Sequence, residues 1–488
     1  MAETRRFAGL ATRTQLAVAN NLSKIMYKQN SRTKYRNPEL EVYDSYYEGR
    51  QYAGMTPWLQ AMSVDNQHIP VRERAPLINY RLGQIIVMRL ASKLMGSRTK
   101  PEIRVEDDPD TEAFLKSVVQ ISRLYANILE PIRRELASGS VLVRFAIVNG
   151  QYKIEHFLGK WCYPEFDDNG NLIGCRIRYI YEDEQDLDDQ KNPKKKWFQM
   201  DLGPYKDVMY DNPEAKEQQE PVFQEVESVE HNLGFVQAEW FKPNEKPNSF
   251  DGDCVIEPIM GFIDELNYSL SQSSNAVAYN QDPQLAVNNM DEDELETLIR
   301  SSSKAWNLGK DGTAEFIESQ LDGVKVAMDF RDKMKMNVQD LTRVIMLDPE
   351  KIVGNAQSAK AMEVLHGPLV ELVEELRPQL EKHLNSLILK MAMTTLLLDA
   401  RGELVPIEIP QGYKPKSASI VFIWPPIFPL TMEDLQKKVS IASAVSAANI
   451  LSRETAMKWL AKDFGVEDIE EELAKIAAQP VINPFGGF

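Results

Sequence analysis

Residues 348 to 362 read DPEKIVGNAQSAKAM, a polar stretch with two lysines that separates two strongly helical patterns. A loop that cradles nucleotide phosphates needs G-x-x-x-x-G-K-[ST] between a strand and a helix. This stretch has a single glycine, no Gly-Lys-Ser/Thr, and a helical pattern in front of it. It is therefore not a nucleotide loop of that kind. Its candidate functional residues are Lys351, Gly354, Asn355, Gln357, Ser358 and Lys360.

Residue types that carry catalysis are present but form no known pattern. The five histidines are scattered, and none belongs to H-E-x-x-H or pairs closely with a cysteine. No G-x-S-x-G, protein-kinase or G-x-G-x-x-G pattern occurs. The three cysteines lack C-x-x-C, which indicates a reducing compartment and no zinc site. We therefore expect no catalytic residue, metal or cofactor, and a hydrolase with partners distant in sequence is the enzymatic alternative.

One turn imitates a calcium-binding loop. Glu165, Asp167, Asn169 and Gly170 occupy the first, third, fifth and sixth positions, but the twelfth is Arg176 instead of a bidentate glutamate. Strand-like sequence flanks the turn on both sides, whereas a calcium loop lies between helices. The sequence therefore predicts an ordinary hairpin turn.

Composition limits the class of protein. The chain has 488 residues, 43% of them hydrophobic, which is enough for a large core divided among several subdomains. Its formal net charge of −17 disfavours a simple nucleic-acid binder, because phosphate contacts need Lys and Arg. The longest apolar stretch, residues 384–398, contains Asn385 and Lys390, and it is too short and interrupted to span a membrane. No signal peptide is apparent.

The first 36 residues oppose the overall charge. They contain eight basic residues and one acid, Glu3. An organelle transit peptide, a basic arm that meets an acidic partner and a solvated basic helix all fit this composition. The basic residues are Arg5, Arg6, Arg13, Lys24, Lys28, Arg32, Lys34 and Arg36.

The elements that position these residues begin with helices and hairpins. Apolar periodicity predicts helices over 77–96, closed by Gly96, and over 111–138. The period then changes to two over 141–148, and Asn149-Gly150 predicts a hairpin there, because both turn positions favour positive φ.

The strand pattern continues through a second hairpin. It turns at 167–170 and returns over 172–181, after which the acidic and basic run of 182–196 is expected to be a solvated loop. Further strands are expected at 197–200 and within 234–241. An antiparallel sheet follows from this order.

Two long helices flank a small insert. The first covers 254–280, and Asp282-Pro283 ends it. The insert contains a short strand at 285–287 and an acidic helix, and the second long helix covers 325–347. We expect an antiparallel pair of helices with a small head at its tip. The acidic residues of the insert are Asp291, Glu292, Asp293 and Glu294.

The strongest helical pattern in the chain follows the opening loop, from Met362 to Met391. Pro368 and Pro378 lie inside it, and each removes a backbone donor, so the helix should be kinked or broken at both. Ser419–Trp424 is expected to be a strand. Helices over 431–449, over 453–464 with Ser452 as N-cap, and over 466–477 complete an α+β, mainly helical protein.

The order of these parts resembles the portal proteins of tailed double-stranded DNA bacteriophages, the head-to-tail connectors, from about Tyr43 to Ala477. No single stretch is specific, but their order and spacing together are. The family often has Gly after the loop serine, where this chain has Ala359, which affects the expected loop conformation. The stretches that carry the resemblance are Tyr46–Arg50 with Asn79 and Leu94–Gly96, Phe250–Asp253 leading to Ile263–Asn267, Asp348-Pro349 with Gly354-Asn355 and Ser358, and Ile450–Thr455.

The resemblance implies a portal fold with named parts. The wing combines helices with an antiparallel sheet, the stem is a helix pair, the clip is a small α/β insert, and a kinked tunnel helix and a short helical crown complete the chain. The implied boundaries are a basic N-terminal arm at 1–36, wing 37–253, stem helices 254–280 and 323–347, clip 281–322, tunnel loop 348–361, tunnel helix 362–398, wing return strands 399–430, and crown with C-terminal tail 431–488.

The resemblance also implies a function. Portal proteins form rings, usually of twelve subunits, at one capsid vertex of the virion, and double-stranded DNA passes through the channel during packaging and ejection. The implied partners are further copies of the chain, the major capsid protein, the scaffold, the terminase and the tail adaptor. We expect assembly in the host cytoplasm and no membrane contact. Another structural protein of a viral head or neck is the alternative, although it would not need the stem–clip–stem–loop order.

Overall fold

The computed structural model describes most of the chain in two compact units. One unit comprises the described parts of Met1–Val344 and Leu372–Trp424, and the other those of Ile345–Glu371 and Pro425–Phe488. The predicted clip residues Asp291–Glu294, the tunnel loop 348–361 and residues 1–30 of the arm lie outside the described residues. The described residues are 31–106, 108–188, 190–215, 221–246, 249–281, 284–288, 313–317, 322–345, 364, 366–409, 420–427, 432–448, 450–461 and 473–476.

The first unit begins with helices packed on one another. α3 (Ser31–Glu48) and α4 (Leu82–Met95) both contact α7 (Leu129–Ser138). α4 turns an apolar stripe inward, which excludes water from this helical layer. Gly96 caps α4 as expected. The buried residues of the stripe include Leu82, Ile86, Leu90 and Leu94.

The prediction of a single helix over 111–138 is wrong. The chain forms α5 (Pro109–Ile121), the short α6 (Leu124–Asn127) and α7 instead. Arg123 interrupts the helix with a positive φ of 49°, and Asp108 caps α5 by accepting a hydrogen bond from the Thr111 amide at 3.1 Å. The apolar periodicity runs across all three helices, so it did not reveal the breaks.

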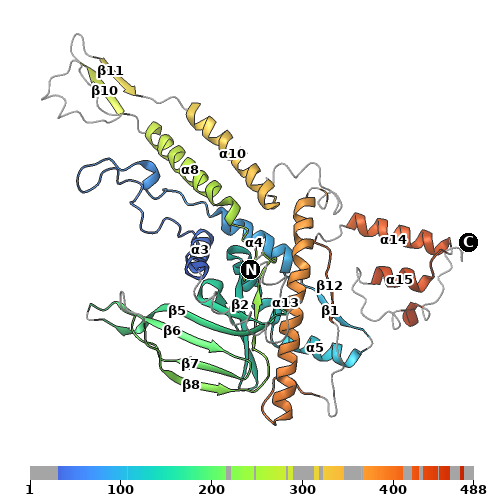
Figure 1. Cartoon of the computed structure of the whole chain (residues 1–488). Coiled ribbons are helices and arrows are strands. Elements are labelled where there is room, and N and C mark those ends of the chain that lie inside the picture. Colours follow the sequence, from blue (N-terminus) through green and yellow to red (C-terminus); the bar gives the residue numbers. More distant parts are fainter. Residues whose placement is uncertain are drawn as a thin grey trace, which may run out of the picture. The chain divides into compact units, whose positions relative to one another are not determined.

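Two antiparallel sheets follow. β2 (Val141–Val148) lies between β3 (Gln151–Leu158) and β9 (Ala238–Phe241). The Asn149-Gly150 turn is confirmed, with φ of 51° and 71° and Val148 opposite Gln151. The second sheet has the order β4-β5-β6-β7-β8, with β8 at its outer edge (Figure 1). Its strands are β4 (Cys162–Phe166), β5 (Leu172–Leu187), β6 (Pro193–Leu202), β7 (Lys206–Tyr210) and β8 (Glu225–Glu230).

The solvated loop expected over 182–196 is also wrong for most of its length. β5 and β6 continue as a hairpin, with Glu182 opposite Lys195 and Asp183 opposite Lys194. Lys196 lies 2.8 Å from a carboxylate oxygen of Asp183. The acidic run pairs with the basic run across the hairpin, which offsets the charge of each strand.

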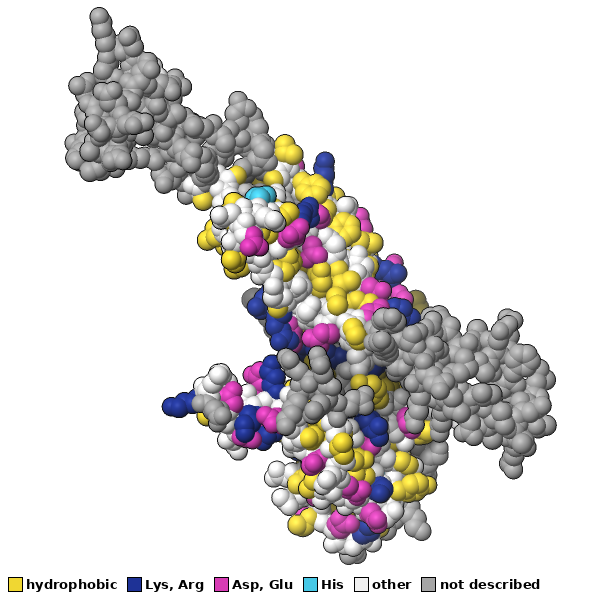
Figure 2. All heavy atoms as spheres, turned by 60° about the vertical axis from the view of Figure 1, so that its left-hand side comes forward, with side chains coloured by type: hydrophobic (Ala, Val, Ile, Leu, Met, Phe, Trp, Pro, Cys, Tyr) yellow, Lys and Arg dark blue, Asp and Glu magenta, His cyan; other side chains and the backbone are white. Residues whose placement is uncertain are grey.

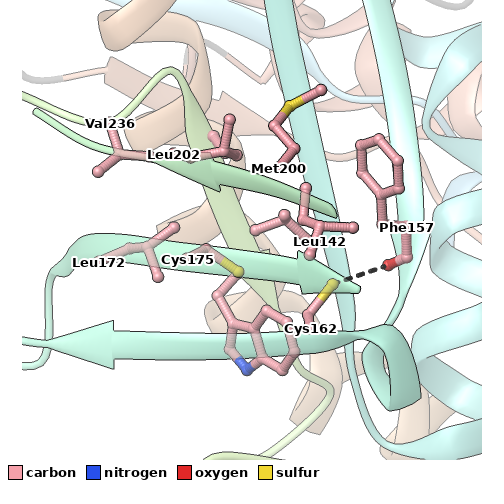
Figure 3. Close-up of a cluster of buried hydrophobic side chains, with 11 residues drawn as sticks. Leu142, Phe157, Cys162, Leu172, Cys175, Met200, Leu202 and Val236 are labelled. Carbon is pink, nitrogen blue, oxygen red and sulfur yellow. Dashed lines mark hydrogen bonds between the residues drawn. The ribbon is translucent and has the colours of Figure 1, made fainter. Parts of the chain in front are cut away.

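The sheets enclose a hydrophobic core, drawn in Figure 3. Cys162 and Cys175 lie inside it on neighbouring strands, and both are free thiols, as is the buried Cys254. Burial raises the pKa of Cys162 well above its ordinary value and that of Cys254 to about 12. The other members of the core are Leu142, Phe157, Leu172, Ile177, Met200, Leu202, Val236, Ala238 and Trp240.

The expected pair of long helices is present. The short 3-10 turn Glu257–Ile259 leads into α8 (Met260–Gln281), and α10 (Asp322–Thr342) runs back beside it (Figure 1). β10 (Gln284–Asn288), which confirms the expected strand at 285–287, pairs antiparallel with β11 (Thr313–Ile317). α10 ends five residues before the expected position, because Arg343 adopts a positive φ of 56°.

α13 (Gly367–Ala400) is the longest helix among the described residues. The expected kink at Pro368 is wrong, because Pro368 is the second residue of the helix, where the missing amide hydrogen is not needed. Pro378 lies inside α13, and the helix continues through it without a break. The expected strand near 419–424 is confirmed as β12 (Ile420–Ile423), paired with β1 (Glu102–Val105).

The second unit contains α14 (Met432–Ala447) and α15 (Arg453–Ala461), which contact each other. Ser452 caps α15 as expected, since its hydroxyl accepts from the Thr455 amide at 3.1 Å. Among the described residues, no helix is long and apolar enough to cross a membrane.

Candidate functional site at the base of the helix pair

Two sequence motifs separated by more than two hundred residues meet at the base of α8. Tyr46, at the end of α3, donates to Asp264 Oδ2 at 2.6 Å, and Tyr52 donates to Asp264 Oδ1 at 2.7 Å. Burial, supported by the hydrogen bond to Asp264, raises the pKa of both phenols well above the ordinary value. The two tyrosines therefore stay protonated and act as fixed hydrogen-bond donors.

The next turn of α8 binds a backbone segment. The fully buried Asn267 accepts from the Tyr80 amide at 2.9 Å and donates to the Tyr52 hydroxyl at 3.0 Å. Ser271, one turn further, accepts from the Ile78 amide at 3.0 Å. These side chains supply partners to two backbone N–H groups that are partly shielded from water. The segment before α4 is thereby fixed against α8.

Gly49 closes this junction. Its φ is +72°, its carbonyl accepts from Asn79 Nδ2 at 2.8 Å, and an added Cβ would lie 2.8 Å from Arg81 Nε. The positive φ favours glycine, and a larger residue would also require the Arg81 side chain to move. The motif Tyr46–Arg50 and Asn79 are therefore in direct contact in the folded chain.

The lead-in to α8 is held by a buried ion pair. Asp251 accepts from Arg36 Nε and Nη2, both at 2.6 Å, and from the Ser140 hydroxyl at 2.5 Å. Arg36 also donates to the Cys162 carbonyl at 2.8 Å. Both side chains of the pair are only 10% exposed. Arg36 therefore belongs to the core and not to the basic arm in which the sequence placed it.

A close backbone approach joins the same lead-in to α7. Gly139 has a φ of +93° and accepts from the Gly252 amide at 2.8 Å. A Cβ on Gly139 would lie 2.7 Å from the Gly252 carbonyl oxygen. Cys254 Sγ donates to the Ala137 carbonyl at 2.6 Å. The motif Phe250–Asp253 is thus a packing device between a helix end and the start of α8.

Glu239 connects β9 to α13. Its carboxylate accepts from Lys390 Nζ at 2.7 Å and from the Ser386 hydroxyl at 2.6 Å, and it lies 3.3 Å from His383 Nδ1. Burial raises the pKa of Glu239, but hydrogen bonding to His383 and the charge of Lys390 outweigh burial, so the pKa lies below the ordinary value. The site is an ion pair that fixes the helix on the sheet.

None of these clusters is arranged for catalysis. Among the described residues, no group of three His, Cys, Asp or Glu side chains could hold a metal ion. The calcium-like turn is an ordinary turn, in which Asp167 accepts from the Asn169 and Asn171 amides at 2.9 and 2.7 Å. Burial raises the pKa of the buried Glu135 well above its ordinary value, which favours the neutral form of this carboxyl in the core.

The predicted tunnel-loop and clip residues cannot be placed, because they lie outside the described residues. The junction residues that sequence reasoning missed are Arg36, Glu239 and His383. Each contacts a partner more than one hundred residues away, because Arg36 pairs with Asp251, and Glu239 contacts both His383 and Lys390. No local spacing signals such pairs.

Figure 2 shows how charge is distributed over one face of the described residues. On the face drawn in Figure 2, basic and acidic side chains are interspersed with hydrophobic ones. A nucleic-acid binder that grips phosphates would gather Lys and Arg on one face.

Comparisons with known proteins point to one family. The family described as phage portal protein, SPP1 Gp6-like, matches residues 28–480. Two solved structures are similar, both at 9% identity and covering 78% of this chain and 89% of theirs. They are the virion of a native gene transfer agent particle, with a TM-score of 0.43, and the neck of an empty gene transfer agent particle, with a TM-score of 0.42. No curated protein sequence matches the chain.

Proposed function

Because the chain belongs to the SPP1 Gp6-like family of phage portal proteins, we propose that it forms the ring at one capsid vertex through which DNA is packaged and ejected. The observation that carries this proposal is the family match over residues 28–480, which includes every described helix and strand. Proteins of this family are structural.

The helix pair suits the role of a stem. In the proposal, α8 and α10 are the stem helices at the channel, and β10 and β11 belong to the clip at their tip. α13 is the tunnel helix, and α14 with α15 forms the crown. The network around Asp264 and Asn267 would hold the stem base at a fixed angle to the wing, so that force on the clip reaches the wing.

The clip is the proposed docking platform. Residues 281–322 would bind the terminase motor during packaging and the tail adaptor afterwards, and the acidic run Asp291–Glu294 would contribute charge to these contacts. The wing would contact the major capsid protein and the scaffold. We assign the ring twelve subunits by the usual family number.

The negative net charge of the chain supports the proposal of a channel in which DNA moves freely. Twelve copies of a chain with a net charge of −17 carry roughly −200 in total, and such a surface repels phosphates. The tunnel loop is the proposed exception, because symmetry would repeat Lys351 and Lys360 around the channel and give two rings of positive charge. Gly354, Asn355 and Gln357 would give the loop its shape, with Ser358 as the cap of the following helix.

Electron microscopy of the purified protein tests the proposal directly. We expect ring-shaped particles with a central hole, and class averages with rotational symmetry near twelvefold. Particles that remain monomeric or form filaments at assembly concentrations would contradict a portal ring.

A further inference from the structure

A hollow of about 450 Å³ lies on α8 beside the loop between α3 and α4. This loop is fixed to the helix, because the Tyr268 hydroxyl lies 3.0 Å from the carbonyl oxygens of both Arg72 and Arg74. Leu59, in the loop wall, is 82% exposed. The hollow is therefore preformed, and part of its apolar wall is open to solvent. Its lining includes Trp58, Leu59 and Val71 from the loop, and Gln272, Asn275 and Ala276 from α8.

α10 carries an apolar stripe that is also exposed. Met334 and Val338, on one side of this helix, are buried. Val326 and Phe330 lie one turn apart on the neighbouring side, and they are 68% and 46% exposed. Apolar side chains exposed together on one helix face form a surface that is suited to contact with another apolar surface.

The hollow and the α10 stripe lie on different sides of α8. In Figure 1, α10 lies on one side of α8 and the loop between α3 and α4 on the other, and both contact α8. No described residue of α10 lines the hollow. A ring of identical chains closes through head-to-tail contacts, in which one surface of each chain meets a different surface of the next. The two apolar surfaces satisfy this requirement.

The two surfaces also lie at the same height along the helix pair. α8 ends at Gln281 and α10 begins at Asp322, next to the paired ends of β10 and β11. At about 1.5 Å per residue, Gln272–Ala276 lie about 8–14 Å from this end, and Val326 and Phe330 lie about 6–12 Å from it. Rotation about a ring axis does not change height. Neighbouring copies whose helix pairs run along the axis therefore bring the two surfaces level with each other.

Charges beside the two surfaces are complementary. Lys333 lies one turn after Phe330, and Glu73 lies in the short turn that contributes Val71 to the hollow. Lys333 and Glu73 are exposed, and neither forms an ion pair with a residue that the structure describes. A head-to-tail contact brings these opposite charges together, whereas two facing α10 stripes would bring two lysines together.

From these observations we propose that Val326 and Phe330 of one chain pack into the hollow of the next chain in the ring. The partner is a second copy of this chain, and the contact is head-to-tail. This inference rests on the proposed ring, and it adds the surfaces through which neighbouring helix pairs meet.

Cross-linking between co-assembled variants tests the contact. One chain carries Leu59→Cys, and the other, marked by an affinity tag, carries Phe330→Cys. A short bismaleimide should join them, so that a heterodimer appears on a denaturing gel, whereas each variant alone should stay monomeric. The three native cysteines are buried, so the wild type gives the background.

Met336→Cys is the matched control for Phe330→Cys. Met336 is 63% exposed on the same helix, but it lies about 120° around the helix axis from Phe330. With Leu59→Cys it should give little heterodimer. Equal amounts of heterodimer from Met336→Cys and Phe330→Cys, or homodimers of Phe330→Cys alone, would overturn the proposed contact.

Electron microscopy of the same samples separates this contact from the proposed ring. Rings that yield no heterodimer would overturn the contact and leave the portal ring standing, whereas a wild-type chain that forms no rings would overturn both. Loss of rings with Leu59→Cys or Phe330→Cys but not with Met336→Cys would support the contact. A ladder of covalent oligomers from rings of the double variant, Leu59→Cys with Phe330→Cys, would support both.

Discussion

Asp264 is the residue on which the junction at the base of α8 depends most. It accepts hydrogen bonds from two phenols that remain protonated. Replacing it by asparagine removes the charge and turns an amide group toward one of the donors. We expect Asp264→Asn to destabilise the protein by about 1–3 kcal/mol, measured as a lower thermal unfolding midpoint.

Its neighbour Glu265 provides the matched control. Glu265 forms a two-point ion pair with Arg72 at 2.6 and 2.9 Å, but both side chains are exposed. Glu265→Gln should cost about 0–1 kcal/mol. If the two substitutions lower the unfolding midpoint equally, the tyrosine hydrogen bonds to Asp264 contribute no more stability than the exposed ion pair.

Glu239 predicts a specific dependence of stability on pH. Its pKa in the folded protein lies below the ordinary value, so its contribution is fully present above the unfolded pKa of about 4.3 and is lost as the pH falls through the folded pKa. At pH 7, Glu239→Gln should lower stability by about 3 kcal/mol, because Lys390 loses its buried partner.

The measurement for Glu239 is the difference in unfolding midpoint between wild type and Glu239→Gln at several pH values. Below about pH 4 the difference should shrink, as Glu239 itself becomes protonated in the wild type. A difference that grows as the pH falls would contradict the sign of this linkage.

Single residues were predictable from sequence where the signal is local. The Asn149-Gly150 turn and the Ser452 cap follow from backbone chemistry within four residues. Arg36 was assigned to a basic arm because its neighbours in sequence are basic. Only the folded chain brings Asp251 to it, across 215 positions.

At the scale of elements, Gly139 joins α7 to the lead-in of α8. Gly139→Ala combines a strained φ with a clash against the Gly252 carbonyl, and it should cost about 3 kcal/mol. Gly170→Ala is the control, because its φ is also positive, at +82°, but nothing lies within 4 Å of an added Cβ. It should cost about 1 kcal/mol. Similar decreases in the thermal unfolding midpoint of the two variants would contradict the predicted clash.

The boundaries of elements were predictable where composition changes sharply along the chain. They were not predictable where pairing between strands determines the structure. The pair α8 and α10 follows from two apolar stripes around a small insert. The hairpin over 182–196 does not, because its charged residues are stabilised by pairing across two strands. Pro368 shows a similar limit, because its effect on the helix depends on whether it lies in the first turn or in the interior.

At the scale of the whole molecule, the proposed tunnel loop predicts a defect in DNA retention. We propose that the loop is the narrowest part of the channel, so deleting Val353–Gln357 should leave ring assembly intact but let packaged DNA leak from filled heads. Nuclease-sensitive DNA in purified heads is the measurement. The control is Lys351→Glu with Lys360→Glu, which keeps the loop length and separates charge from constriction. Full DNA retention after the deletion would reject a retaining role for the loop.

The family, shown by the match over residues 28–480, could be predicted from the order of features in the sequence, in which two long helices flank an insert and a polar loop follows them. The roles proposed for Lys351, Lys360 and the acidic run Asp291–Glu294 do not follow from local sequence patterns, because in the proposal their surroundings come from other copies of the chain and from docking proteins.

The burial of Cys162, Cys175 and Cys254 has a consequence for the handling of the folded protein. All three are free thiols inside the fold, and the raised pKa of Cys162 and Cys254 disfavours the reactive thiolate at these two. We therefore expect the three cysteines to stay reduced when the folded protein passes from a reducing to an oxidising solution.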